Sequence, residues 1–287
     1  MAAIARTGAA HSPALEVRAT RDRELLREFL DTDRLFSAYA ICDLDDREFP
    51  RTRWGIALDD GRAVAVCMEY SGMNPQPLFV MGTSVGIEAV LADVIRPRVA
   101  YLAARSASLP AVQRQYHVDA GPPMVRMWVD RDSFAGHPGD AVRIHPGQID
   151  ELNRLYGLGT ASWLPVDAVA SGVYFGVEVD GRLVAAAGTH VVSREARLAA
   201  VGNVLTHRDH RGQGHAKRTT GAVTAELLRT CDQVVLNVRS DNPPALAAYR
   251  ALGYQDYMHF EERLIRRRGT LWDAIVMPLR RWFPERR

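Results

Sequence analysis

The segment with the clearest potential for chemistry is a loop with two glycines at residues 211–214. An apolar stretch at 198–206 predicts a strand that precedes it, and a helix is predicted to begin directly after it. Such a loop directs unpaired backbone N–H groups and the positive end of the helix dipole toward one point, which favours a bound anion. Arg211, Lys217 and Arg218 add positive charge nearby. A diphosphate group is therefore the expected ligand.

The spacing within this loop differs from two common phosphate-binding patterns. It has no Gly-Lys-Ser or Gly-Lys-Thr, as a P-loop requires, and it has no Gly-x-Gly-x-x-Gly. Arg211, Gly214 and Ala216 match instead the Arg/Gln-x-x-Gly-x-Gly/Ala signature of the GCN5-related N-acetyltransferases (GNAT). The loop therefore resembles the pyrophosphate loop of that family.

A second motif lies downstream, at the spacing from the first that the same family shows. Residues 236–254 predict a strand, a turn and a helix that ends at Gly253. Five positions resemble the family's Asn-x-x-Ala-x-x-x-Tyr-x-x-x-Gly-Phe/Tyr stretch, namely Asn242, Ala245, Tyr249, Gly253 and Tyr254. With both motifs in the right order, residues 140–265 resemble a GNAT domain.

This resemblance implies an α/β fold with a splayed, mixed β-sheet flanked by helices, and acetyl-CoA or another acyl-CoA held between two parallel strands. Those strands would be residues 198–206 and 234–238. The pantetheine arm would pair with the first strand, and the pyrophosphate would lie in the glycine loop. No metal is expected. The residues expected to contact acetyl-CoA are Val204, Leu205, Thr206, Arg211, Gly212, Gln213, Gly214, His215, Ala216, Lys217, Asn242 and Tyr249.

The resemblance also implies an N-acetyltransferase in which an amine attacks acetyl-CoA directly within a ternary complex. The amine must be neutral, the tetrahedral oxyanion needs a hydrogen-bond donor, and the departing thiolate needs a proton. Tyr249 stands at the family position that protonates the thiolate, and a phenol is a neutral donor at pH 7. Packing on an apolar helix face is its alternative role. Asn242 either holds the CoA arm or caps its helix.

The general base is left open by the sequence. Family members often carry a carboxylate on the strand before the pyrophosphate loop, where this sequence has Asn203. A water molecule relayed through Asn203 is one candidate, and Glu178, His190 and His207 are others by reach. The expected catalytic residues are thus Tyr249, Asn203 and Glu178. Because the strand carboxylate is missing, a CoA-binding sensor or interaction module without turnover is the alternative function.

The order of predicted elements repeats itself, which favours two domains in these 287 residues. Asp-Gly-Arg turns occur at 60–62 and 180–182, each between two predicted strands. We predict two tandem GNAT-like domains, although Asp-Gly hairpins are common enough to match by chance. The predicted boundaries are a flexible arm at 1–13, a degenerate domain at 14–135, a linker at 136–147, a catalytic domain at 148–265 and a basic amphipathic tail at 266–287.

The first predicted domain opens with a helix at 23–40 and closes with a strand at 124–129. Its loop after the predicted strand 78–81 has glycines but no Arg-x-x-Gly-x-Ala pattern and no basic cluster. The later helix contains Tyr116 without the Asn-x-x-Ala frame. We expect this domain to have lost CoA binding and to shape the acceptor pocket of the second domain.

Charge and composition narrow the expected partners and location. The formal net charge is +2, but seven arginines and two acidic residues after residue 263 leave residues 1–263 mildly acidic, which argues against nucleic acid. Three widely spaced cysteines build neither a disulfide framework nor a zinc site, and no apolar run has the length of a membrane span. We expect a cytoplasmic enzyme with a small-molecule amine or amino-acid-like acceptor and no stable membrane insertion.

The sequence leaves the oligomeric state open, and a homodimer is possible. The tail is expected to dock on its own subunit or on a partner subunit, with disorder or a membrane-surface role as alternatives.

Overall fold

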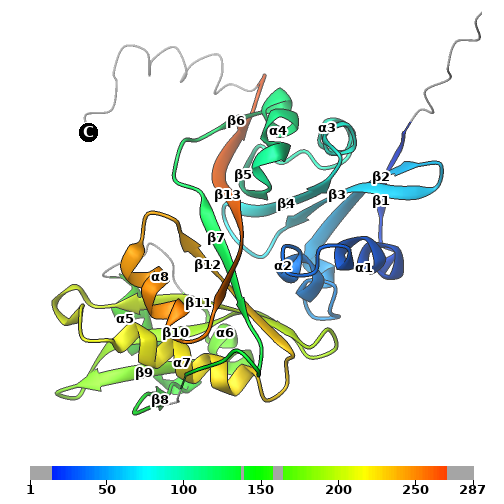
Figure 1. Ribbon diagram of the computed structural model, residues 1–287. Helices are drawn as coiled ribbons and strands as arrows, with labels where there is room; N and C mark the ends of the chain where they lie inside the picture. The colour runs from blue at the N-terminus through cyan, green and yellow to red at the C-terminus, as the bar shows by residue number, and fades with distance from the viewer. Residues whose placement is uncertain (1–14, 137–138, 158–163, 270–287) are drawn as a thin grey trace, which may run out of the picture.

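The computed structural model describes residues 15–136, 139–157 and 164–269. Within them the chain forms one mixed sheet of 13 strands. Figure 1 shows this sheet spread over two lobes with helices packed on it, each lobe built mostly from one half of the chain. The predicted mixed α/β fold is confirmed. The predicted arm at 1–13 and residues 270–287 of the predicted tail lie outside the described residues.

The helical region near the start of the first half is divided into two helices. The single helix predicted at 23–40 is wrong, because α1 ends at Asp31 and α2 begins at Ala38. Thr32 donates its hydroxyl to the carbonyl of Phe29 at 2.7 Å, and this competition with the backbone favours a helix end. The elements of this half are β1 (Glu16–Thr20), α1 (Arg23–Asp31), α2 (Ala38–Cys42), η1 (Phe49–Arg51), β2 (Thr52–Asp59), β3 (Arg62–Tyr70), β4 (Gln76–Gly82), α3 (Ser84–Asp93), β5 (Val99–Ala104), η2 (Ser106–Ser108), α4 (Leu109–Gln115), β6 (Tyr116–Val118) and β7 (Met124–Val129).

The second half repeats the order of hairpin, third strand, helix and parallel fourth strand. Its elements are β8 (Val142–Arg143), η3 (Pro146–Gln148), α5 (Ile149–Gly157), α6 (Val166–Ser171), β9 (Tyr174–Val179), β10 (Arg182–Ser193), β11 (Leu198–Thr206), η4 (Arg208–His210), α7 (His215–Leu227), β12 (Gln233–Arg239), α8 (Pro243–Arg250) and β13 (Gln255–Arg267). None of the described helices is long and apolar enough to cross a membrane.

The two predicted Asp-Gly hairpins have the same backbone conformation. Asp60 and Gly61 have φ angles of 52° and 77°, and Asp180 and Gly181 have φ angles of 52° and 71°. Two successive residues with positive φ form the turn whose twist suits a two-residue hairpin. Each hairpin is followed by a parallel pair of strands, β4 with β5 and β11 with β12. The two halves are therefore copies of one topology.

The last strands of the two halves are exchanged. Strand β7, predicted to close the first half, lies between β12 and β13 in the sheet of the second half. In return, the C-terminal part of β13 lies between β5 and β6 of the first half, with Ile265 opposite both Ala100 and Val118. In Figure 1 these two strands run side by side from one lobe into the other. Strand pairing thus crosses the predicted domain boundary in both directions.

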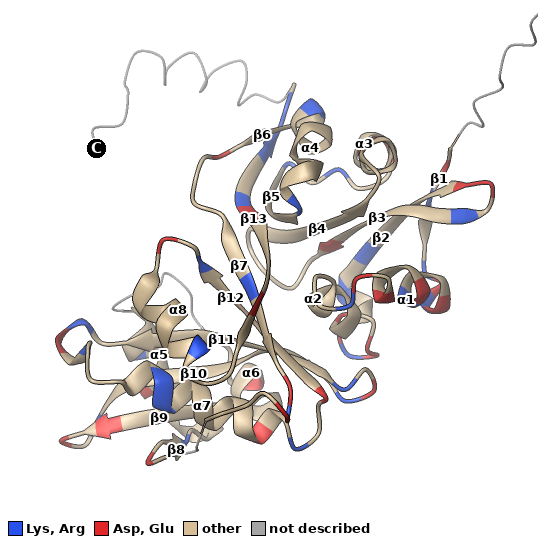
Figure 2. Ribbon diagram, in the orientation of Figure 1, with Lys and Arg blue, Asp and Glu red and all other residues tan. Residues whose placement is uncertain are grey.

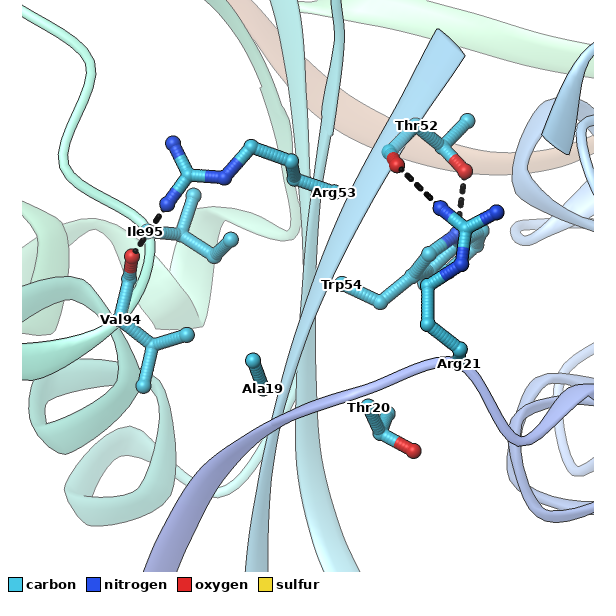
Figure 3. Close-up of a pocket in the computed structure, with 8 residues that line it drawn as sticks. All are labelled: Ala19, Thr20, Arg21, Thr52, Arg53, Trp54, Val94 and Ile95. Carbon is cyan, nitrogen blue, oxygen red and sulfur yellow. Dashed lines mark hydrogen bonds between the residues drawn. The ribbon is translucent and has the colours of Figure 1, made fainter. Parts of the chain in front are cut away.

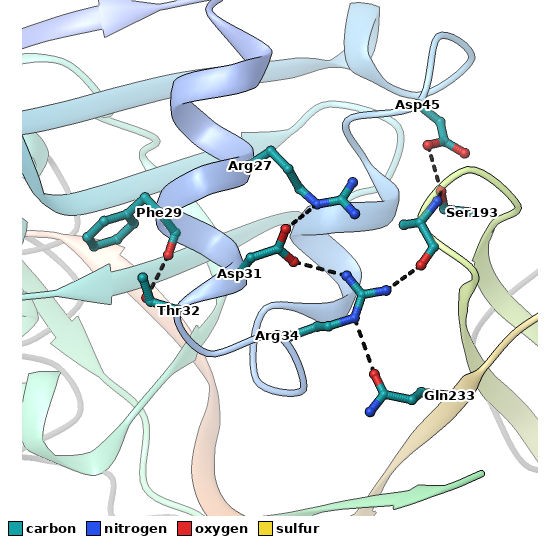
Figure 4. A network of polar contacts seen from close by, with 9 residues as sticks. Arg27, Phe29, Asp31, Thr32, Arg34, Asp45, Ser193 and Gln233 are labelled. Atoms are coloured by element: carbon teal, nitrogen blue, oxygen red, sulfur yellow. Dashed lines mark hydrogen bonds and ion pairs between the residues drawn. The ribbon is translucent and has the colours of Figure 1, made fainter.

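An apolar core and a polar network also join the halves. Helix α2 packs on β10 and β11, and Phe36 and Ile41 share one core with Leu198 and Phe260. Beside this core, Arg34 donates to the carbonyl of Ala196 and to Gln233 Oε1. Figure 4 shows Arg34 directed toward Gln233. Figure 2 shows acidic and basic segments interspersed on both lobes.

Candidate active site

The parallel strands β11 and β12 separate part-way along their length. Leu198 to Val201 pair with Gln233 to Leu236, and beyond that point no pairing continues. A cavity of about 240 Å³ lies where the strands part. Past Val201 the edge of β11 that faces β12 carries backbone groups without a strand partner. The predicted splay between these two strands is confirmed.

An irregularity at Asn203 bends β11 at the cavity. Asn203 has a φ of 51°, a left-handed conformation that asparagine tolerates better than most residues. The hydroxyl of Tyr156 donates to the Asn203 carbonyl at 2.5 Å, and Asn203 Nδ2 donates to the hydroxyl of Tyr174 at 3.1 Å. Opposite it, the register of β10 shifts twice between Ala186 and Val191. The backbone and the side chain of Asn203 are thus each held by a tyrosine hydroxyl.

The glycine loop leaves the N-terminus of α7 open. Gly212 and Gly214 have φ angles of 79° and 76°, and a β-carbon on either would meet no atom within 4 Å. Gly214 is the N-cap of α7 and has no side chain to accept from the first N–H groups. Since α7 has 13 residues, its dipole adds to these free donors. The loop can therefore receive an anion.

Two buried polar atoms beside this loop lack a partner among the described residues, namely Thr206 Oγ1 and His215 Nε2. Buried polar atoms are normally hydrogen-bonded, so both fit a site that receives a polar ligand. Arg218 donates to His215 Nδ1 at 2.6 Å and pairs with Asp140 at 2.6 Å. Burial and the nearby Arg218 lower the pKa of His215. The imidazole is thus neutral at pH 7, with its proton on Nε2.

Helix α8 and its N-cap contribute one part of the cavity lining. Asn242 is the N-cap of α8 and accepts from the backbone N–H of Ala245 at 3.4 Å, so the capping role holds, and its side chain also lines the cavity. Tyr249 lines the cavity and is 7% exposed. Burial raises its pKa to about 12. The phenol is therefore a neutral donor at physiological pH.

The opposite wall of the cavity includes residues from the first half. Tyr39 of α2 and Met124 of β7 line it together with His190 of β10. The Tyr39 hydroxyl lies 2.9 Å from His190 Nδ1, and His190 Nε2 lies 3.2 Å from Asn203 Oδ1. Sequence analysis missed Tyr39 and Met124, because no local pattern in the first half marks them.

The candidates for the general base differ in whether they line the cavity. Glu178 is exposed on β9, paired with Leu183 close to the hairpin turn, and it does not line the cavity, so we do not retain it. His207 caps η4 by accepting from the backbone N–H of Asp209, ahead of the glycine loop. Asn203 and His190 both line the cavity. These two stay as candidates.

The comparison with protein families agrees with this geometry. Residues 148–254 match the model of the acetyltransferase (GNAT) family. These residues form a GNAT domain. No curated protein matches the chain in sequence.

Three solved structures extend the likeness to both halves. A tandem GNAT protein from the clavulanic acid biosynthesis pathway is 16% identical, with a TM-score of 0.51, and the match covers 90% of this chain and 99% of that one. A Drosophila protein is 13% identical, with a TM-score of 0.65 and coverage of 88% and 98%. A GCN5-related N-acetyltransferase from Sphaerobacter thermophilus is 14% identical, with a TM-score of 0.61 and coverage of 88% and 95%. At these identities the likeness concerns the fold, and it confirms the tandem GNAT architecture.

The GNAT-like first half has no open loop at the corresponding place. Strand β4 ends at Gly82 and α3 begins at Ser84. The side chain of Thr83 accepts from the backbone N–H of Gly86, and the backbone N–H of Thr83 donates to the carbonyl of Val64 at 2.8 Å. A β-carbon on Gly82 would collide with the backbone of β3. The first turn of α3 is thus capped and packed on β3, whereas the corresponding loop of the second half leaves the N-terminus of α7 open.

A second depression, of about 190 Å³, lies at the edge of the first half (Figure 3). Arg21 and Arg53 border it, but both are already engaged, Arg21 with the carbonyl of Thr52 and Arg53 with the carbonyl of Val94. It lies on β1, β2 and the end of α3, away from the strands that part in the GNAT domain. We assign it no role in the reaction.

Proposed function

We propose that this protein is an N-acetyltransferase that transfers the acetyl group of acetyl-CoA to an amine by direct attack in a ternary complex. The observation that carries this proposal is that one cavity is lined by residues from α8 through to α2. It brings Tyr249, the unpaired edge of β11 and a polar wall with His190 around one space. A donor could enter from the α7 and α8 side, and an acceptor from the α2 side.

The glycine loop and β11 form the binding site for acetyl-CoA, the acetyl donor. The pyrophosphate accepts from the first N–H groups of α7, and Thr206 Oγ1 and His215 Nε2 gain the partner that they lack. The pantetheine arm pairs with the free edge of β11 beyond Val201. Lys217 is exposed at the start of α7 and adds positive charge near the phosphates.

The cavity supplies what thioester aminolysis requires. The amine nitrogen forms a bond with the thioester carbon, and the oxyanion meets backbone N–H groups on the free edge of β11. The carbon–sulfur bond then breaks, and Tyr249 gives its proton to the sulfur. Tyr249 recovers a proton from solvent. The products are an amide and the free thiol of CoA.

The first half has a structural role in this proposal. Because its α3 N-terminus is capped by Thr83, it does not bind CoA, and its α2 and β7 complete the wall of the acceptor pocket. One equivalent of acetyl-CoA per chain is therefore expected.

The test is a titration of the full chain with acetyl-CoA by calorimetry, followed by an assay of thiol release with amino acids, diamines and aminoglycosides. We expect one binding site per chain and thiol release with at least one amine class. Tight binding without thiol release for any amine would instead establish a CoA-binding sensor.

A further inference from the structure

A hydrogen-bonded chain crosses from the first half to the second at the wall of the cavity. The Tyr39 hydroxyl lies 2.9 Å from His190 Nδ1, and the two rings meet edge to face with their centroids 5.9 Å apart. His190 Nε2 in turn lies 3.2 Å from Asn203 Oδ1. Tyr39, His190 and Asn203 all line the cavity.

The hydrogen bonds beyond Asn203 determine the tautomer of His190. The hydroxyl of Tyr174 donates to the carbonyl of Thr189 at 3.1 Å, so its oxygen accepts from Asn203 Nδ2 at 3.1 Å. The Asn203 Oδ1 atom then faces His190 and can only accept. The proton of neutral His190 must therefore be on Nε2. Its Nδ1 lone pair accepts the hydroxyl proton of Tyr39.

We propose that Tyr39 is the residue that takes the proton of the attacking amine and passes its own proton to His190. This inference rests on the proposed acetyltransferase function and identifies its general base. It makes the first half a direct contributor to catalysis.

The proton transfers balance without a further reactant. As the amine nitrogen bonds to the thioester carbon, its N–H proton moves to the Tyr39 oxygen, and the Tyr39 hydroxyl proton moves to His190 Nδ1. His190 becomes an imidazolium ion and Tyr39 is again a neutral phenol. The imidazolium then releases one proton to solvent, and Tyr249, which protonated the thiolate, takes one from solvent.

The surroundings favour a relay over a free phenolate. Burial raises the pKa of Tyr39, and the neighbouring Glu262, Cys42 and Asp43 raise it further, whereas the guanidinium of Arg126, 5.1 Å from the ring centroid, lowers it. A concerted transfer to His190 avoids the phenolate. Desolvation by the surrounding protein also lowers the pKa of His190, although the residue is exposed to the cavity, and the hydrogen bond to Asn203 raises it. The imidazole is thus neutral at pH 7 and ready to accept.

The kinetic test compares Tyr39→Phe with Tyr257→Phe in the full chain. Tyr39→Phe removes the relay hydroxyl and keeps the ring, so kcat should fall by roughly 10²-fold or more, with an unchanged KM for acetyl-CoA. Tyr257→Phe is the matched control, because its hydroxyl also bonds across the halves, to Asp33 at 2.6 Å, but lies outside the cavity. His190→Leu combined with Tyr39→Phe should lose no more than either alone.

A structural measurement accompanies the kinetics. Nitrogen-15 NMR of labelled histidine should show His190 protonated on Nε2, with an Nδ1 shift that changes in Tyr39→Phe. A proton on Nδ1 overturns the relay. Thiol release by the wild type that Tyr39→Phe leaves unchanged also overturns the relay but not the proposed function. No thiol release by the wild type with any amine overturns the proposed function, and with it the catalytic role of Tyr39.

Discussion

The imidazole of His190 occupies the space that a β-carbon on residue 202 would need. Built onto Gly202, such a carbon would overlap His190 Nε2, Cδ2 and Cε1. Glycine at 202 is therefore what allows His190 to lie against β11, between Tyr39 and Asn203.

Gly202→Ala should displace His190 and slow the reaction while leaving the fold intact. The obstacle is a side chain that can rotate, so the free energy of unfolding should change by roughly 1 kcal/mol or less, and kcat should fall roughly tenfold or more. Gly157→Ala is the control, because a β-carbon there meets no atom of the described residues within 4 Å. Equal kcat values for Gly202→Ala and Gly157→Ala would contradict the assigned position of His190.

Tyr249→Phe should lower kcat roughly 10²-fold and leave acetyl-CoA affinity unchanged, because it removes the proton donor for the thiolate. Since burial raises the pKa of Tyr249 to about 12, ionisation of this donor should cause no loss of rate between pH 7 and 10. Tyr254→Phe is the control: its buried hydroxyl bonds to Thr224 Oγ1 at 2.7 Å and should affect stability alone. The measurements are kcat and the calorimetric affinity for acetyl-CoA in both variants, and equal kcat values for the two would contradict the role of Tyr249.

Gly214→Ala should weaken acetyl-CoA binding. Its φ of 76° costs roughly 1–2 kcal/mol for a residue with a β-carbon, so the loop should relax and the N–H groups of α7 should lose their common direction. Gly181→Ala imposes the same strain, at a φ of 71°, on a hairpin turn outside the cavity. Both variants should lose similar stability. Only Gly214→Ala should show a higher Kd for acetyl-CoA, and a higher Kd in both would point to a global effect.

Asp43→Asn should change how stability depends on pH. Burial, together with the nearby Glu48 and Asp45, raises the pKa of Asp43 to about 8 in the folded chain, against roughly 3.9 when unfolded. Between these values the folded state holds a proton that the unfolded state has lost, so stability falls as pH rises from about 4 to about 8 and then levels off.

The slope assigned to Asp43 is at most about 1.4 kcal/mol per pH unit. Asp43→Asn should remove this contribution, so the variant should lose less stability than the wild type between pH 5 and 8 in urea unfolding. Asp46→Asn removes an exposed carboxylate of the same loop and should keep the wild-type slope. Parallel stability curves for wild type and Asp43→Asn would exclude a buried, protonated Asp43.

The exchanged strands predict that the halves do not fold separately. A fragment of residues 1–136 lacks the part of β13 between β5 and β6, and a fragment of 139–287 lacks β7 between β12 and β13. Each should be unfolded or aggregated alone by circular dichroism and gel filtration, and co-expression should yield one complex. A chain cleaved at an inserted protease site after Gly136 should stay associated. A folded 139–287 fragment that binds acetyl-CoA would contradict this prediction.

The sequence by itself determined the parts of the protein that depend on local chemistry. The strand at 198–206, the glycine loop and helix α7 follow from apolar spacing and from two glycines that adopt positive φ. Asn242 and Tyr249 were found because they match a short family motif, in which the cap and the tyrosine stand about two helix turns apart. These preferences act over a few residues, so a pattern of residue types is sufficient to reveal them.

Only the tertiary structure decided which distant segments meet. It placed Tyr39 beside His190, 151 residues later in the chain, and it placed Glu178 outside the residues that line the cavity. It also exchanged β7 and β13 between the halves. The two halves share one topology, so no local pattern selects which half receives each last strand. The choice rests on the packing of the whole sheet and of the core between α2 and β11, where contributions from residues far apart in the sequence add together.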